Sequence, residues 1–180
     1  MISGPSGAGK GTLVTRVRER RSNLGLTVSA TTRAPRKGEV DGVNYFFLTC
    51  EEFDRRVANG EFVEWAEVHG NCYGTLVSEV QSKLASGASL ILEIDVQGAL
   101  QVKERFPEAV LIFIKPPSLE VLRERLVGRG TETPETIELR MANAADELAL
   151  ADRYDDVVVN DDLDRATDEL VRVLDMHERI

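Results

Sequence analysis

The feature that most restricts the fold is a glycine-rich segment close to the start of the chain. Glycines at its first and sixth places, followed by lysine, form the G-x-x-x-x-G-K pattern of a phosphate-binding loop. Glycine conformations let successive backbone N–H groups turn toward one anion, and a helix that follows directly points its positive end at the same charge. The segment therefore predicts a site for a nucleotide polyphosphate, made by Gly4, Pro5, Ser6, Gly7, Ala8, Gly9, Lys10, Gly11 and Thr12.

Two details of this loop are unusual. Gly11 stands where a serine or threonine commonly holds Mg²⁺, with Thr12 next in the chain. Only Met1, Ile2 and Ser3 precede the loop, although such a loop normally follows a buried strand. We expect either a very short first strand or a natural chain that starts further upstream, and favour the second. A chance match to a glycine-rich turn is the alternative, but the helical spacing of apolar residues after Lys10 argues against it.

Composition excludes several classes of function. The net charge of −9 argues against general nucleic-acid or membrane-surface binding. The sequence contains no apolar run long enough for a membrane span and no signal peptide. Cys50 and Cys72 lack the spacing of metal ligands and suit reduced thiols. With 180 residues, we expect one compact domain of a soluble, cytoplasmic protein.

Strand-like and helical segments alternate along the chain. Apolar runs predict strands at 24–29, 90–95, 109–114 and 157–159, and helical spacing follows the loop and recurs at 77–85, 118–126, 134–151 and 163–174. Residues 29–76, with β-like runs at 45–48 and 62–68 and a short helix at 51–59, have the character of a small β-rich insertion. Alternation around a phosphate loop predicts an α/β protein with a doubly wound, mostly parallel sheet.

Two groups of arginines lie in or beside loops that contain glycine, where functional residues concentrate. Arg33 and Arg36 form the first group; Arg125, Arg129 and Arg140 form the second. Phosphoryl transfer between two nucleotides needs cations on several sides and the exclusion of water. The two groups therefore suit an acceptor subdomain and a lid, whereas surface charge is the better interpretation of Arg16, Arg18, Arg20 and Arg55.

Together these motifs resemble those of the guanylate kinase family over essentially the whole chain, in the same order. The segments that carry the resemblance are the loop, Ser29–Arg36, Glu64–Ala66, Gly70–Thr75, Asp95–Gly98, Arg125–Thr133 and Val159–Leu163. The resemblance implies a P-loop kinase fold with a mostly parallel five-stranded sheet flanked by helices. It divides the single domain into a core (1–28, 77–124, 143–180), a GMP-binding subdomain (29–76) and a helical lid (125–142).

The resemblance also implies an activity, the transfer of the γ-phosphoryl group of ATP to GMP with Mg²⁺. On this basis Glu64 and Thr75 read guanine, and Asp95 lies near the base and the metal. The pattern alone would favour a solvent-facing position for Glu64. The residues expected to hold the GMP phosphate are Ser29, Arg33, Arg36, Tyr45 and Tyr73.

On the donor side, the resemblance implies that Lys10 and the lid arginines Arg125, Arg129 and Arg140 stabilise the transferring phosphates. Asn160 resembles a contact on the adenine side, and Mg²⁺ is expected near Thr12 and Asp95, bound directly or through water. The alternatives are a kinase of another nucleoside monophosphate and a non-catalytic, peptide-binding module of the same fold. The intact loop argues against the module. Either a monomer or a homodimer is compatible with the sequence.

Overall fold

The computed structural model describes residues 1–68, 70–85, 87, 89–128, 130 and 133–178. The chain divides into two compact units. Unit 1 combines Met1–Arg21 with Glu108–Ile180, and unit 2 is Ser22–Pro107. The phosphate loop and the second arginine group therefore belong to unit 1, whereas the residues expected to bind GMP belong to unit 2.

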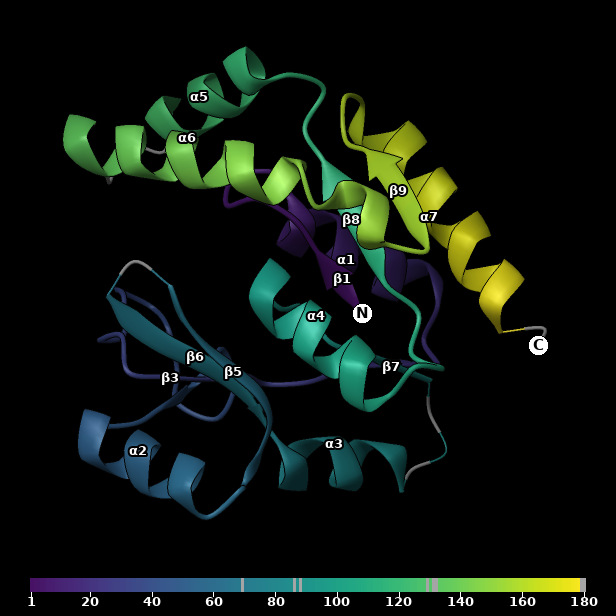
Figure 1. Cartoon of the computed structure of the whole chain (residues 1–180). Coiled ribbons are helices and arrows are strands. Elements are labelled where there is room, and N and C mark those ends of the chain that lie inside the picture. Colours follow the sequence, from purple (N-terminus) through teal and green to yellow (C-terminus); the bar gives the residue numbers. More distant parts are fainter. Residues whose placement is uncertain (69, 86, 88, 129, 131–132, 179–180) are drawn as a thin grey trace. The chain divides into compact units, whose positions relative to one another are not determined.

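Unit 1 is built on a parallel sheet with the strand order β1-β8-β9 (Figure 1). Leu111 to Ile114 are completely or almost completely buried, which is the burial that a parallel sheet covered on both faces requires. The elements of unit 1 are β1 (Ile2–Ser3), α1 (Lys10–Arg20), β8 (Ile112–Lys115), α5 (Leu119–Gly128), α6 (Pro134–Leu148), the 3₁₀ turn η1 (Ala151–Arg153), β9 (Asp156–Val159) and α7 (Leu163–His177).

Helices α5 and α6 pack on each other through their own apolar cluster, which contains Leu122, Leu126, Ile137 and Ala144. Helix α6 begins as the sequence predicts, because the Thr133 hydroxyl accepts a hydrogen bond from the Thr136 N–H (3.3 Å) and proline occupies the first helical position. The predicted lid, 125–142, starts inside α5 and ends inside α6, and its role as a moving part stays a prediction.

The charged faces of α1 and α7 are joined by ion pairs at the surface of unit 1. Arg16 pairs with Asp164 and Arg20 with Asp168, and both arginine side chains are more than two-fifths exposed. Pairs this exposed contribute little to stability. The interpretation of these two arginines as surface charges is confirmed.

Unit 2 contains a parallel pair, β2-β7, and a four-stranded sheet with the order β4-β3-β6-β5. Within the larger sheet β3 pairs parallel with β4, while β6 runs antiparallel to both β3 and β5. The elements of unit 2 are β2 (Leu24–Leu26), β3 (Ala30–Thr31), β4 (Phe46–Phe47), α2 (Cys50–Ala58), β5 (Phe62–Val68), β6 (Asn71–Leu76), α3 (Val77–Leu84), β7 (Ser89–Ile91) and α4 (Val96–Arg105).

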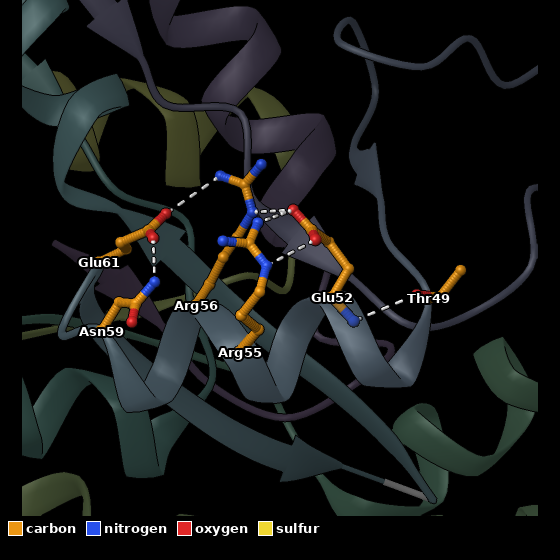
Figure 2. Close-up of polar contacts among 6 residues, drawn as sticks. All are labelled: Thr49, Glu52, Arg55, Arg56, Asn59 and Glu61. Carbon is orange, nitrogen blue, oxygen red and sulfur yellow. Dashed lines mark hydrogen bonds and ion pairs between the residues drawn. The ribbon is translucent and has the colours of Figure 1, made fainter.

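Helix α2 closes the small sheet of unit 2 with an aromatic contact. Its only buried residue, Phe53, stacks on Phe62 of β5 with ring centroids 4.5 Å apart. Figure 2 shows the polar side of the helix, where Glu52 accepts hydrogen bonds from both Arg55 and Arg56. The interpretation of Arg55 as a surface charge is therefore confirmed.

Most predicted elements are present, with shorter strands. Of the predicted strand 24–29, only 24–26 form a strand, β2, and β3 begins just after it at Ala30; helix α4 was not predicted by the spacing argument. Within the described part of the chain, no helix combines the length and the apolar composition that a membrane span needs.

Candidate functional site

The backbone of the phosphate loop in unit 1 can be formed only with glycine at key positions. Gly4 and Gly9 have φ of 140° and 93°, which side chains disfavour. A Cβ on Gly4 would lie 2.2 Å from the Ile114 carbonyl oxygen of β8, and one on Gly9 would lie 2.3 Å from the side-chain nitrogen of Asn160. The loop is therefore pressed against the carboxyl ends of β8 and β9, where ligands of open α/β sheets bind.

Lys10 is the first residue of α1, and its ammonium group lies over its own loop. Its Nζ donates to the carbonyl oxygens of Gly4 (2.5 Å) and Pro5 (3.1 Å). The first turn of α1 contains no acidic residue, so the positive end of the helix is not neutralised locally. A lysine and a helix N-terminus at one loop are the elements of a phosphate site.

Two of the three predicted lid arginines lie against this loop. Arg140 of α6 donates to the Ser6 hydroxyl (2.5 Å), and Arg125 of α5 donates to the backbone oxygens of Asn160 (2.8 Å) and Ala8 (3.4 Å). Arg129 lies outside the described residues. Gly7, Ala8 and Pro5 of the loop are buried, whereas Gly11 and Thr12 are exposed on the first turn of α1.

In unit 2, Glu64 and Thr75 face each other across the β5–β6 ladder. Both side chains are buried, with exposed fractions of 2% and 0%. Among the residues that the structure describes, Glu64 Oε1 and Thr75 Oγ1 make no hydrogen bond of normal geometry, although Thr75 lies close enough to Glu64 to act against the rise in the pKa of that carboxyl group. Buried polar atoms are almost always paired, so an unpartnered acceptor beside an unpartnered hydroxyl points to a ligand that supplies the missing bonds. The solvent-facing position that the strand pattern favoured for Glu64 is wrong.

The surroundings of Glu64 make its charge depend on pH near neutrality. Burial, together with the nearby carboxylate of Asp95, raises the pKa of Glu64 to about 7 against the opposing effect of Thr75. Gly98 of α4 leaves the space for this side chain, because a Cβ there would lie 2.4 Å from Glu64 Oε2. Asp95 is the N-cap of α4, and its Oδ1 accepts from the N–H groups of Gln97 and Gly98.

A second cluster in unit 2 surrounds the guanidinium group of Arg33. It lies over the rings of Tyr45 and Phe47, with its central carbon 5.3 and 5.8 Å from their centroids. Its Nη2 donates to both carboxylate oxygens of Glu39, at 2.9 and 3.0 Å, and this bond lowers the pKa of Glu39. The ring of Tyr73 approaches that of Tyr45, with centroids 6.2 Å apart.

Some of the residues predicted to hold the GMP phosphate have their side chains in this cluster, whereas others contact it only through their backbone. The structure groups Arg33 with Tyr45 and Tyr73. The Arg36 side chain is exposed, but its backbone N–H donates to Glu39 (2.6 Å), and the Ser29 carbonyl accepts from Phe46. Sequence reasoning missed Glu39, although an acid six residues after Arg33 in a basic, turn-forming segment was a usable signal.

The donors available for a metal are few. The described residues contain no group of three or more histidine, cysteine or acidic side chains that could hold a metal ion. Thr12 offers one exposed hydroxyl in unit 1, and Asp95 offers a carboxylate in unit 2. Hard oxygen donors of this kind fit Mg²⁺, which commonly keeps several waters and takes its remaining ligands from substrate phosphates.

Comparison with known proteins identifies the family. The family model described as "Guanylate kinase" matches residues 1–177. A guanylate kinase of Gloeobacter violaceus is 56% identical over 174 residues, which cover 97% of this chain and 85% of that protein. One from Fusobacterium nucleatum is 49% identical over 175 residues, covering 97% and 94%.

A solved structure agrees with these relatives. The crystal structure of guanylate kinase from Anaplasma phagocytophilum superposes with a TM-score of 0.80 at 38% sequence identity, and the match covers 97% of this chain and 82% of that one. This similarity confirms the predicted P-loop kinase fold. The chain belongs to the guanylate kinase family.

Proposed function

We propose that this protein transfers the γ-phosphoryl group of ATP to GMP, forming ADP and GDP. The observation that carries the proposal is the pair of buried, unpartnered oxygens, Glu64 Oε1 and Thr75 Oγ1, in a chain whose phosphate loop is intact. The family places the chain among nucleotide-binding phosphotransferases, and this pair supports guanine as the base of the acceptor.

The choice of guanine follows from its hydrogen-bonding edge. Guanine N1–H and the 2-amino group are both donors, and an ionised Glu64 carboxylate can accept from them together. The hydroxyl of Thr75 can donate to guanine O6. Adenine has an acceptor at N1, which would face the carboxylate unpaired, and a site built to hydrogen-bond one base rejects the other strongly.

On the acceptor side, Arg33 is the main candidate for the GMP phosphate, with Tyr45 and Tyr73 beside it. In the absence of nucleotide its guanidinium is bound by Glu39, so the phosphate would compete with that carboxylate for the same donors. Arg36 and Ser29 stay candidates for the same phosphate on the basis of the resemblance.

On the donor side, the loop would hold the triphosphate of ATP. A phosphate oxygen of GMP attacks the γ-phosphorus in line, without a covalent enzyme intermediate. Lys10, Arg125 and Arg140 stabilise the charge that develops on the transferred oxygens, and Arg129 and Asn160 stay predicted members of the site. Bound Mg²⁺ would neutralise phosphate charge, with the Thr12 hydroxyl and, through water, Asp95 as the residues to hold it.

A coupled assay for ADP tests this proposal. With ATP as donor, GMP should be phosphorylated at a kcat/KM about 10⁴-fold or more above that of AMP or UMP, because the wrong base leaves buried polar groups unpaired. Equal rates with AMP or UMP would overturn the assignment of guanine. A monomeric or homodimeric state and a cytoplasmic location stay predictions.

The glycine at position 11 gives a further prediction. Gly11→Ser adds a hydroxyl on the exposed first turn of α1, where the family pattern commonly has a metal ligand. We expect this variant to need several-fold less Mg²⁺ for half-maximal rate, and to unfold with a free energy about 0.5–1 kcal/mol higher because glycine is a poor helix former. Gly11→Ala is the matched control: it should gain the stability but leave the Mg²⁺ requirement unchanged. If both variants change the Mg²⁺ requirement equally, an added oxygen ligand is not the cause.

A further inference from the structure

Asn160 lies at the point of unit 1 where the sheet meets the phosphate loop. It follows the last residue of β9, and its backbone N–H donates to the Lys115 carbonyl at the end of β8 (2.8 Å). Only 6% of the residue is exposed. Its backbone is thus held by the sheet, and its side chain has little freedom to turn elsewhere.

The side-chain amide of Asn160 is bonded to the loop. Nδ2 donates to the Ala8 carbonyl at 2.8 Å, and this bond is buried. The same nitrogen lies so close to Gly9 that a Cβ on Gly9 would approach it to 2.3 Å. The amide therefore occupies the space directly beside the left-handed turn at Gly9, which immediately precedes Lys10.

The planarity of the peptide bond makes this contact directional. In a trans peptide the N–H points away from the preceding carbonyl. When Asn160 holds the Ala8 carbonyl, the Gly9 N–H is directed to the opposite side of the same peptide. A loop that binds phosphate depends on the direction of such N–H groups. Asn160 can thus set the direction of a loop donor without touching the phosphate.

Asn160 also connects the loop with Arg125. The Arg125 guanidinium donates through Nη2 to the backbone carbonyl of Asn160 (2.8 Å) and through Nη1 to the backbone carbonyl of Ala8 (3.4 Å). One residue therefore contacts both the turn that precedes Lys10 and a proposed catalytic arginine. We propose that Asn160 is a positioning residue, which orients the Ala8–Gly9 peptide and seats Arg125 for the triphosphate, independently of the base that the triphosphate carries.

This inference rests on the proposed use of the loop as the donor site. Binding of inorganic tripolyphosphate distinguishes a positioning role of Asn160 from a direct contact with adenine. Tripolyphosphate carries the phosphates of the donor without its base or sugar. In Asn160→Ala we expect the dissociation constants of tripolyphosphate and of ATP, measured by calorimetry, to rise by the same factor of about tenfold, the effect of losing one buried hydrogen bond. If Asn160 acts only on adenine, ATP binds more weakly while tripolyphosphate binds as before, which would overturn the proposal.

Asn160→Asp supplies a second readout that loss of structure would not produce. An ionised carboxylate cannot donate to the Ala8 carbonyl, but a protonated carboxyl group can. The defect in tripolyphosphate affinity relative to the unmodified protein should therefore shrink as the pH falls. A loss of tripolyphosphate affinity in Asn160→Asp that does not change with pH would count against the bond to Ala8. This test remains usable even if Asn160→Ala does not fold.

The matched control is the exposed neighbour Asp161, whose replacement in Asp161→Asn changes charge beside the site but leaves the amide in place. It should bind tripolyphosphate as the unmodified protein does. Failure of the proposed function has a different signature: the unmodified protein would not phosphorylate GMP at all. If GMP is phosphorylated and both Asn160 variants bind tripolyphosphate normally, only the positioning role is wrong.

Discussion

Replacing Lys10 with alanine is expected to lower kcat for phosphoryl transfer from ATP to GMP by about 10³-fold or more, the scale of losing a charged group that stabilises the transition state. The first turn of α1 contains no other basic side chain, so no second cation of that turn replaces the lysine. Stability should change by only about 1–2 kcal/mol, because the bonds lost are those from Nζ to the Gly4 and Pro5 carbonyls.

The measurement is a single-turnover assay together with urea unfolding. Lys83→Ala is the control, since Lys83 lies on the surface of α3 and its ion pair with Glu79 spans 3.8 Å. It should retain full activity. Activity of Lys10→Ala equal to that of this control would refute the catalytic role of Lys10. It would also favour the peptide-binding module of the same fold, for which an intact loop is not required.

The phosphate loop was predictable because its determinants are local. The φ angles of Gly4 and Gly9, and the start of a helix at Lys10, depend on residues next to one another in the chain. The two arginine groups could also be singled out as candidates, because arginines in glycine-containing loops stand out from those on helix surfaces, and their function stays a prediction. What the pattern could not supply was their contacts, such as the bond from Arg140 to Ser6.

Glu64 shows why a strand pattern can fail. Alternation assigns a polar residue to the solvent side of a strand, but the register of β5 shifts between Phe62 and Glu64, and both residues are buried. Only the resemblance to a family made Glu64 a candidate site residue. Helix α4 was not predicted, although Val96, Ala99 and Val102 are spaced for a buried helical face.

The second large effect is expected at Glu64 and depends on pH. At pH 8 the unmodified protein presents an ionised Glu64, and Glu64→Gln should bind GMP about 100-fold more weakly because it loses charge-assisted bonds to guanine. With a pKa of about 7, Glu64 becomes protonated as the pH falls. The ratio of the two dissociation constants, in which the titration of the GMP phosphate cancels, should therefore shrink toward pH 5. Calorimetry at several pH values measures it.

The same substitution should have the opposite effect on the stability of the protein without nucleotide. The pKa of Glu64 is raised from 4.5 to about 7 by folding, so the native state binds the proton more tightly than the unfolded chain does. Stability from this group is complete below pH 4.5 and falls as the pH rises to about 7, by about 3 kcal/mol in total. Glu64→Gln carries no such penalty, so urea unfolding should find it more stable than the unmodified protein at pH 8, and the difference should be smaller at pH 5.

Glu67→Gln, an exposed change on the same strand, should give no pH-dependent gain. If Glu64→Gln is less stable at both pH values, the carboxylate is stabilised within unit 2, and guanine is not needed to balance its burial.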